Sequence, residues 1–546
     1  MAVLGASTAF SPALVSTAHA DERHHGAKQL ELQVLGSYRT GFFDEGGSEI
    51  PAHDSTSQRL FVTNGAEGKI DIIDMHDPMN PTLISQVDLA PYGKAATSVA
   101  VKRGLVAAAV VNNDKQQNGK VVFMDTEGTI LNQLTVGALP DMLTFSANGR
   151  YLLVANEGEP NDDYSIDPEG TVSIIDLDCD DERDGKHHHD MTLGQCAAQL
   201  EQESVRTAGF TSFNGKPLAP GIRVFGPNAT VAQDMEPEYI TIDKNSKTAW
   251  VSLQENNAVA VIDIKKAKVE KLISLGFKDH SLAGNELDAS NKDGGINIAN
   301  WPVFGMYLPD SIASYQFRGK TFIVTANEGD SRDYAGFSEE ARVKDLSLDP
   351  VAFPDAAYLQ ESANLGRLKV TTTMGDIDND GDFDALFSYG ARSFSIRTAD
   401  GELVYDSGSD FERITADQLP ADFNSHNKEN NSFDDRSDDK GPEPEGLAIG
   451  KIGSRTYGFI GLERVGGVMV YDITNPYRPE FVQYINNRDF LGNPALGTAG
   501  DLAPEGLAFI DASDSPINKP LLVVANEVSG STTMYAIELS GKNKER

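Results

Sequence analysis

The stretch LPDMLTFSANGRYLLVANEG, residues 139–158, opens on a Pro-Asp step and closes on a Glu. Between these ends lie two short apolar runs joined by the polar turn SANGR. This pattern is typical of a β-hairpin, in which one strand leads out and a second strand returns. Because the second strand runs back, Asp141 at the start of the first strand and Glu157 at the end of the second are expected at the same edge of the sheet.

Four further stretches repeat this unit along the chain. They open at Pro237-Glu238, Pro309-Asp310, Pro444-Glu445 and Pro504-Glu505, and they close at Glu255, Glu328, Glu463 and Glu527. Each unit continues into further strands, such as GVMVYDI at 467–473, and EIPAHDSTSQRLFVTN at 49–64 keeps the hairpin without the acid pair. Units of about four strands that recur roughly every forty to fifty residues predict an all-β fold, a single β-propeller.

We expect seven blades, or eight if the strands within 367–408 form a blade of their own instead of completing the one opened at Pro309. The segment LELQVLGSY at 30–38 is expected beside 532–539 in the last blade, where it would close the ring and remove exposed edges. Segments 178–222, 329–365 and 411–443 interrupt the repeat and are expected as loop insertions on one face. The propeller therefore spans 30–540, followed by a tail at 541–546.

The charge of the chain excludes some classes of partner. Its 546 residues include 82 acidic and 46 basic side chains, which gives a net charge of −36. A field of that sign repels nucleic acid and attracts divalent cations, so no nucleic-acid partner is expected. No apolar run long enough to span a bilayer follows the N-terminus, and we expect a monomer without a membrane span.

The N-terminal residues indicate export. Residues 1–20 are apolar and small and end in Ala18-His19-Ala20, a cleavage pattern typical of a signal peptide, and 21–29 would follow as a disordered linker. The protein is therefore expected in the periplasm or outside the cell. Cys179 and Cys196 fit such an oxidising compartment, where we expect them to form a disulfide within one polar insertion. Two unrelated free thiols are the alternative.

The segment DIDNDGDFD at 376–384 places acidic side chains at alternate positions. Asp376, Asp378 and Asp380 occupy loop positions 1, 3 and 5, Gly381 allows a tight turn, and Asp382 and Asp384 follow at positions 7 and 9. Calcium takes about six to eight oxygen ligands, which such a loop turns inward. Phe387 stands where an EF-hand has its last Glu, so a shorter calcium loop is favoured. We expect structural calcium here, with the backbone carbonyl of Asp382 among its ligands.

The acids that open and close the five hairpins form a set that we call the carboxylate collar. Its members are Asp141, Glu157, Glu238, Glu255, Asp310, Glu328, Glu445, Glu463, Glu505 and Glu527. Like charges that are this crowded must take up protons, pair with Arg or Lys, or bind metal. In one interpretation each Glu caps backbone amides of its neighbouring blade. In the other, the collar is a multi-metal site in which cations hold a phosphate and activate water.

The second interpretation assigns roles to individual residues. Glu157, Glu255, Glu445, Glu505 and Glu527 are candidate metal ligands, and Glu328 and Glu463 are candidate catalytic residues. Arg332, Arg392 and Arg464 are candidates for holding substrate oxygens, with Lys440 as a further charge partner. The chain contains no G-x-S-x-G, Walker A, Rossmann or H-E-x-x-H motif, which removes the commonest hydrolase and nucleotide-binding interpretations.

Several longer motifs resemble one known family. They are GSYRTGFFDEGGSEIPAHD (36–54), TANEGDSRDY (325–334), YGARSFSI (389–396), RSDDKGPEPEGLAIG (436–450) and LERVGGVMVYDITNP (462–476), together with the opening stretch. With these motifs the chain resembles the choice-of-anchor I family of exported bacterial proteins and the mesenchyme-specific cell-surface glycoproteins related to them. The resemblance implies a propeller of the YVTN or WD40-like type, and some relatives carry an alkaline-phosphatase label.

The sequence thus predicts a secreted calcium-binding propeller that hydrolyses small phosphoesters, with calcium as cofactor and a second divalent or transition metal as an option. The alternative is a non-catalytic binding, adhesion or matrix module with structural calcium and an extracellular surface partner. A phosphatase must gather several acids and at least one Arg around one pocket, whereas a binding module can leave the acids on separate blades.

Overall fold

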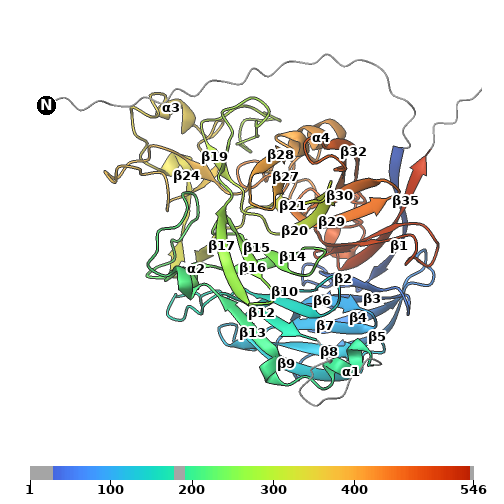
Figure 1. The fold of residues 1–546 in the computed structure, drawn as a ribbon. Coiled ribbons are helices and arrows are strands. Elements are labelled where there is room, and N and C mark those ends of the chain that lie inside the picture. The colour runs from blue at the N-terminus through green and yellow to red at the C-terminus, as the bar shows by residue number, and fades with distance from the viewer. Residues whose placement is uncertain (1–28, 178–190, 541–546) are drawn as a thin grey trace, which may run out of the picture.

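Seven four-stranded antiparallel sheets follow one another along the chain in the computed structural model, which describes residues 29–177 and 191–540 (Figure 1). The innermost strands β2, β6, β10, β14, β20, β29 and β33 contact one another in turn, and β33 contacts β2. The sheets therefore form a closed ring, a seven-bladed β-propeller. The predicted signal peptide, most of the predicted linker, the tail at 541–546 and Cys179 lie outside the described residues.

Each blade runs from an inner strand beside the axis to an outer strand at the rim. Blade 1 contains β2 (Pro51–Asp54), β3 (Arg59–Asn64), β4 (Lys69–Asp74) and β5 (Thr82–Asp88), and blade 2 contains β6 (Ala96–Lys102), β7 (Leu105–Val110), β8 (Asn118–Asp125) and β9 (Ile130–Ala138). Blade 3 contains β10 (Pro140–Phe145), β11 (Tyr151–Asn156), β12 (Thr171–Asp176) and β13 (Val205–Gly209), and blade 4 contains β14 (Pro237–Ile242), β15 (Thr248–Leu253), β16 (Ala258–Asp263) and β17 (Lys268–Ser274). Blade 5 contains β20 (Ile312–Phe317), β21 (Lys320–Asn327), β27 (Ser393–Thr398) and β28 (Leu403–Asp406). Blade 6 contains β29 (Pro444–Ile452), β30 (Arg455–Leu462), β31 (Val468–Asp472) and β32 (Glu480–Ile485), and blade 7 contains β33 (Pro504–Ile510), β34 (Leu521–Asn526), β35 (Ser531–Ser540) and β1 (Gln29–Arg39).

The N-terminal strand completes the last blade, as the sequence predicts. β1 pairs antiparallel with β35, with Leu30 opposite Leu539 and Tyr38 opposite Thr532. Blade 7 thus takes three strands from the C-terminal end of the chain and one from the N-terminal end. This pairing holds the ring closed, because opening it would break a full strand ladder.

The pairing of β27 decides the number of blades. β27 pairs with β21, where Phe322 lies opposite Thr398, and β28 pairs with β27. These two strands therefore complete the blade opened at Pro309. The other strands of 367–408 join a separate five-stranded sheet in the order β18 (Phe277–Asp279), β19 (Phe304–Met306), β26 (Phe387–Ser388), β25 (Lys369–Thr371) and β24 (Glu340–Arg342).

The insertions differ in part from their expected bounds. The segment 178–222 contains β13, which is the outer strand of blade 3, and an insertion between β17 and β20 supplies β18 and β19. The remaining elements are the hairpin β22 (Asp333–Tyr334) and β23 (Phe337–Ser338), the helices α1 (Leu193–Ala197), α2 (Val231–Asp234), α3 (Ala356–Leu359) and α4 (Asp410–Gln418), and the 3-10 turns η2 (Gln202–Ser204), η3 (Thr211–Phe213), η4 (Val343–Asp345) and η5 (Pro494–Leu496). Figure 1 shows α3, β24 and β19 together at the upper left of the ring.

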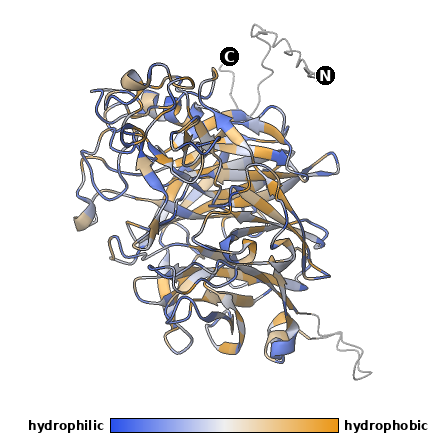
Figure 2. Ribbon diagram, turned by 90° about the vertical axis from the view of Figure 1, so that its left-hand side faces the viewer, coloured by the Kyte–Doolittle hydropathy of each residue, from blue (hydrophilic) through white to orange (hydrophobic). Residues whose placement is uncertain are grey.

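The hydrophobic core lies between neighbouring blades. Phe61 and Ile70 of blade 1 pack with Val106 of blade 2, and Leu60 of blade 1 packs with Leu521 of blade 7, which continues the core across the closure. In Figure 2 the hydrophobic residues concentrate in the strands. Burial of these apolar faces is the main force that holds blade to blade. Polar and charged residues line the axis instead.

Candidate metal centre

A repeated kink places the opening acid of four of the five hairpins at the axis. The strand register shifts between Pro140 and Leu143 in blade 3. Equivalent shifts follow Pro237, Pro444 and Pro504 at the start of the inner strands of blades 4, 6 and 7. A bulge of this kind breaks the alternation of the strand and re-aims the side chains within it. In these four blades the acid after the Pro lies inside the bulge and lines the axial cavity. Asp310 lines the same cavity without such a shift.

A strained turn fixes the closing Glu beside the opening acid. The backbone N–H of Glu157 donates to the carbonyl of Leu139 at 2.9 Å, and that of Glu527 donates to the carbonyl of Ala503 at 2.8 Å. Leu139 and Ala503 both have positive φ, 47° and 59°. Such a backbone costs about 1–3 kcal/mol for each residue that has a Cβ, and it persists where the surrounding structure enforces it. The strained residues Leu139 and Ala503 therefore help to hold the collar acids in place.

The carboxylates meet in one axial cavity of about 330 Å³. Eight of the ten collar acids line it, namely Asp141, Glu157, Glu238, Asp310, Glu328, Glu445, Glu463 and Glu505. Asp330, Lys440 and Arg464 complete its charged lining. Nine carboxylates thus share a small space with two cationic side chains. The structure places these acids on one face and close to the axis, as the direction of the strands predicts.

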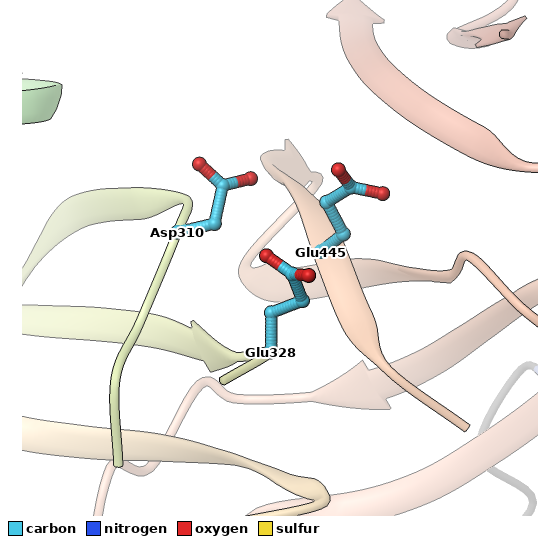
Figure 3. Close-up of side chains that lie close together, drawn as sticks. All are labelled: Asp310, Glu328 and Glu445. Atoms are coloured by element: carbon cyan, nitrogen blue, oxygen red, sulfur yellow. The ribbon is translucent and has the colours of Figure 1, made fainter. Parts of the chain in front are cut away.

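Asp310, Glu328 and Glu445 form a group that suits a cation. Their nearest carboxylate oxygens all lie within 4.8 Å of one another. In Figure 3 the three side chains approach one another across the gap between blade 5, which supplies Asp310 and Glu328, and blade 6, which supplies Glu445. Calcium binds oxygen at about 2.3–2.6 Å, so oxygens at this spacing can share one ion.

A second group of carboxylates, partly in the cavity lining, is paired with cationic side chains. It consists of Glu328, Glu443 and Glu463, whose carboxylate oxygens also lie within 4.8 Å of one another. Lys440 Nζ lies 2.8 Å from Glu328 Oε1 and 3.1 Å from Glu443 Oε2. Arg464 lies 2.8 Å from Glu443 through Nε and 2.9 Å from Glu463 through Nη1. Ion pairs therefore hold one side of the cavity, while Asp310 and Glu445 have no cationic partner among the described residues.

Burial and like charge raise the pKa of most collar carboxylates. Burial and the charge of Glu159 raise the pKa of Asp141 to about 7. Burial also raises the pKa of Glu463 to about 8, although Arg464 opposes it. The pKa of Glu443 is the exception: burial would raise it, but Lys440, Arg464 and Arg436 together hold it below its usual range. The carboxylates whose pKa is raised keep their protons closer to neutral pH, unless a cation replaces these protons.

Several buried oxygens of the collar have no hydrogen-bond partner. They are the Oε2 atoms of Glu238, Glu255, Glu445 and Glu505. A buried acceptor without a partner costs about 1–3 kcal/mol, and such atoms are rare unless a proton, water or ion completes them. Glu238 lines the cavity and is 8% exposed. Its bare oxygen is therefore an independent sign that the cavity takes a ligand.

The amide-capping interpretation does not fit the contacts of the collar. Within the described residues, its carboxylates accept hydrogen bonds from side chains, as from Gln254 to Glu328 at 2.9 Å and from Asn427 to Glu463 at 2.8 Å, and Glu255 accepts one from its own backbone. None of these bonds comes from the backbone of a neighbouring blade. The collar acids thus face one another across the axis, instead of securing separate blades.

Two of the three predicted arginines lie outside the cavity, which corrects their expected role. Arg332 forms buried ion pairs with Asp234 and Glu236, and Arg392 pairs with Glu412 at 2.7 Å and donates to the carbonyl of Ser437 at 2.8 Å. Both side chains are thereby committed to structural contacts. Arg332 follows Glu328 by four residues and Arg392 directly precedes β27, but neither position brings the guanidinium group to the axis. Arg464 does line the cavity.

Glu255 and Glu527 close their hairpins but do not line the cavity. Conversely, the structure shows a further acid near the collar, Glu49, which precedes blade 1. Burial, followed by the charges of Glu527 and Asp141, raises the pKa of Glu49 to about 8. Glu49 lies two residues before Pro51, so a search for acids after Pro misses it, whereas Glu443 follows Pro442 directly but stands before the Pro444 that opens the hairpin. A search on both sides of each hairpin Pro would have found them.

The predicted calcium loop is compact and exposed. Asp376, Asp378 and Asp384 bring carboxylate oxygens within 4.8 Å of one another, and Asp349, Asp382 and Asp384 form a second such group. Asp384 Oδ2 accepts the backbone N–H of Ile377 at 2.8 Å, which closes the loop. Asp380 belongs to neither group and instead accepts the N–H of Asp382 at 3.2 Å. Gly381 has a φ of 99°, the conformation for which its position was singled out.

Two further expectations concern the rest of the chain. Cys196 lies buried in α1, but Cys179 is outside the described residues, so the disulfide between them stays a prediction. In the part of the chain that the structure describes, no helix is long and apolar enough to cross a membrane.

A closed ring of seven blades around a carboxylate-lined axis defines an acidic β-propeller. Residues 49–476 match the choice-of-anchor I domain, and the chain belongs to the choice-of-anchor I family. The resemblance that the long motifs indicate is thereby confirmed.

Two curated proteins are similar in sequence. Gigasin-3a of Magallana gigas is 34% identical over 193 residues, which covers 33% of this chain and 66% of that protein. The mesenchyme-specific cell surface glycoprotein of Strongylocentrotus purpuratus is 29% identical over 282 residues, which covers 45% of this chain and 36% of that protein. The match thus spans just under two thirds of one relative and about a third of the other.

Solved structures of similar shape share little sequence. Hydrazine synthase of Kuenenia stuttgartiensis has a TM-score of 0.45 at 13% identity, covering 92% of this chain and 98% of that chain. The WD40 domain of Toxoplasma gondii coronin has a TM-score of 0.45 at 9% identity, covering 95% of this chain and 89% of that chain. Likeness at this level says nothing about function.

Proposed function

We propose that the axial cavity binds divalent cations and that, with these bound, the protein hydrolyses small phosphoesters. The observation that carries this proposal is the content of the cavity: nine carboxylates and two cationic side chains around about 330 Å³. The ion pairs of the cavity reach Glu328 and Glu463 but neither Asp310 nor Glu445. A cavity of this size has room for a phosphate and a small leaving group, which favours small phosphoesters over polymers.

The residues divide into two roles. Asp310, Glu328 and Glu445 are the cation ligands, because their oxygens are close and those of Asp310 and Glu445 lack a cationic partner. An all-oxygen, carboxylate-rich set suits calcium, magnesium or manganese better than a soft metal. A cation held there would polarise a phosphoryl oxygen and lower the pKa of a bound water. A second divalent ion remains an option of the same cavity.

Arg464 and Lys440 supply the positive side of the cavity. Arg464 uses Nε and Nη1 for Glu443 and Glu463, and a guanidinium has five donors, so it keeps donors for a phosphate oxygen. Lys440 holds Glu328 at 2.8 Å and thereby fixes one of the cation ligands. The two side chains thus orient carboxylates that face the cation and attract the anionic substrate.

We extend the proposal to the calcium loop and to the location of the protein. Asp376, Asp378 and Asp384 would hold a structural calcium ion, supported by the spacing of their oxygens. An exported, extracellular or surface location is supported by membership in the choice-of-anchor I family and by a relative described as a cell surface glycoprotein. Fractionation of the producing cell, with detection of the protein in the periplasm or in the medium, would distinguish a periplasmic from a fully extracellular location.

The experiment measures turnover of a generic phosphoester with calcium, magnesium or manganese, and then with chelator. Asp310→Asn and Glu445→Gln should each lower turnover about 100-fold, because each removes a ligand charge that acts in the transition state. Asp400→Asn, which changes an acid that is 90% exposed, is the matched control and should leave turnover unchanged. Metal-dependent turnover that survives both axial substitutions would contradict the assignment of the site.

A non-catalytic module is the second candidate, and one observation favours it. Lys440 and Arg464 are already engaged by Glu328, Glu443 and Glu463, so a cation in the axis could serve to tie blades 5 and 6 together. In that case calcium raises the melting temperature, the Glu445→Gln substitution removes the rise, and no phosphoester is hydrolysed with any of the three metals. That result would assign the axial cation a structural role.

A further inference from the structure

A second set of buried oxygens lies away from the axis, where two insertions meet. Asp288 comes from the segment between β17 and β20, Glu412 comes from α4, and Asn424 and Asp434 come from the segment between α4 and β29. Asp288 and Asn424 are 0% exposed, Glu412 is 1% exposed and Asp434 is 3% exposed. None of the four lines the axial cavity.

Hydrogen bonds connect these residues into one cluster. The backbone N–H of Asp288 donates to Glu412 Oε2 at 3.2 Å, and Asn424 Nδ2 donates to Glu412 Oε1 at 2.9 Å. Asn424 Nδ2 also donates to Ser437 Oγ at 2.9 Å, and Ser437 Oγ donates to Asp434 Oδ1 at 2.5 Å. The side-chain amide of Asn424 therefore lies between Glu412 and Ser437, and Ser437 in turn contacts Asp434.

Asn424 Oδ1 is buried and has no hydrogen-bond partner, and the same holds for Asn291 Oδ1 and Asp293 Oδ2 on the loop that follows Asp288. The orientation of the Asn424 amide is fixed, because turning it over would set its oxygen against the carboxylate of Glu412. All three atoms are acceptors. What completes them must therefore be a cation or a hydrogen-bond donor such as water.

The charges of the cluster point to a cation. Arg392 pairs with Glu412 at 2.7 Å, but among the described residues no ion pair reaches Asp288, Asp293 or Asp434. Uncompensated carboxylates beside bare amide oxygens are costly in a protein interior. A bound cation would relieve both the charge and the bare oxygens.

We propose that Asp293 and Asp434, with the amide oxygens of Asn291 and Asn424, form a calcium-class cation site that joins the two insertions. No three carboxylates of this cluster lie within 4.8 Å of one another in the described residues, so amide oxygens have to complete the shell. Mixed carboxylate and amide oxygens are the ligands of calcium, whereas zinc prefers nitrogen and sulfur. Asp288 supports the site, because its carboxylate accepts the N–H of Asn297 at 2.6 Å and shapes the loop.

The local fold offers a specific probe of this site. Trp301 packs in one buried cluster with Leu287 and Ala289, which flank Asp288. The other tryptophan, Trp250, lies in a cluster of blades 4 and 5. Terbium binds at calcium sites and emits when a nearby tryptophan is excited. Terbium at the proposed site should therefore emit through Trp301, and calcium should displace it.

The test compares terbium emission in the full chain and in five variants. Emission should fall at least tenfold in Asp434→Asn and in Asp293→Asn, and it should be lost in Trp301→Phe, which keeps the ligands. It should persist in Asp378→Asn and Asp310→Asn, which change the calcium loop and the axial cavity. Circular dichroism of each variant checks that it folds, and Asp293 is less buried than Asp434, so its substitution is the safer of the two.

Two outcomes would overturn the proposal. Emission that disappears in Asp378→Asn but persists in Asp434→Asn would place the ion in the calcium loop. Absence of Trp-sensitised emission, with no calcium-dependent rise in melting temperature that Asp434→Asn removes, would mean that water alone completes the three oxygens. Neither outcome depends on whether the axial cavity is catalytic.

Discussion

The calcium loop and the carboxylate collar contain the same kind of side chain in opposite surroundings. The loop draws its acids from nine consecutive residues and leaves Asp378 exposed, whereas the collar draws its acids from five blades and buries Glu238 to 8% exposure. Water and salt screen the repulsion in the loop, but little screening reaches the axis. Burial, and not the number of acids, therefore decides how strongly each region depends on a cation.

The largest expected effect is a loss of stability at a glycine of the collar, compared with a glycine of the calcium loop. A Cβ on Gly446 would lie 1.8 Å from the carbonyl oxygen of Glu505, which is backbone and cannot move aside, while a Cβ on Gly381 would meet nothing within 4 Å. Gly446→Ala should lower the free energy of unfolding by about 3 kcal/mol. Gly381→Ala should lower it by about 1 kcal/mol, through its positive φ alone. Denaturant unfolding measures both, and equal losses would mean that the inner strands are not packed this tightly.

The next prediction concerns pH in the absence of divalent cations. The pKa of Asp141 is raised to about 7 and those of Glu49 and Glu463 to about 8 in the folded protein. Between their ordinary values near 4 and these raised values, the folded state binds more protons than the unfolded state, so stability falls as pH rises. The melting temperature in chelator should therefore decline from about pH 5 to about pH 8.

Calcium sharpens this test, because a bound cation replaces the protons. With saturating calcium, the decline between pH 5 and pH 8 should largely disappear. Glu463→Gln should flatten the decline in chelator, while Asp378→Asn in the exposed loop should leave it unchanged. A melting temperature that rises over this range in chelator would show that the axial acids are already ionised and compensated.

The two regions also differ in how far sequence reasoning reaches. The repeat of Pro140-Asp141 and its equivalents was enough to predict the ring, its closure by β1 and a common face for the acids, because hairpin direction is a local property. The side chains of Arg332 and Arg392 were misplaced, because a long side chain pairs with whatever acid lies nearest in space. The buried partners of these two arginines, Asp234 and Glu412, come from insertions whose path no repeat encodes.

The smallest expected effect is a calcium-dependent rise in melting temperature that comes from the calcium loop. It tests whether the ligands are those that the sequence motif predicts or those that the structure groups together. The spacing of the motif makes Asp380 a ligand, but the structure groups Asp378 with Asp376 and Asp384 and leaves Asp380 outside. Calcium should raise the melting temperature by a few degrees through this loop. The effect is small because exposed ligands exchange water for an ion with little net gain.

Asp378→Asn should remove this rise, and Asp380→Asn should keep it. The reverse result would mean that the loop rearranges around the ion, so that the alternation of acids describes the bound state better than the present conformation does. Loss of the rise in Asp382→Asn alone would instead place the ion in the neighbouring group with Asp349. The spacing of the acids does not decide which oxygens of the nine-residue motif hold the ion, because Asp384 belongs to both groups. The three isosteric variants, Asp378→Asn, Asp380→Asn and Asp382→Asn, do decide it.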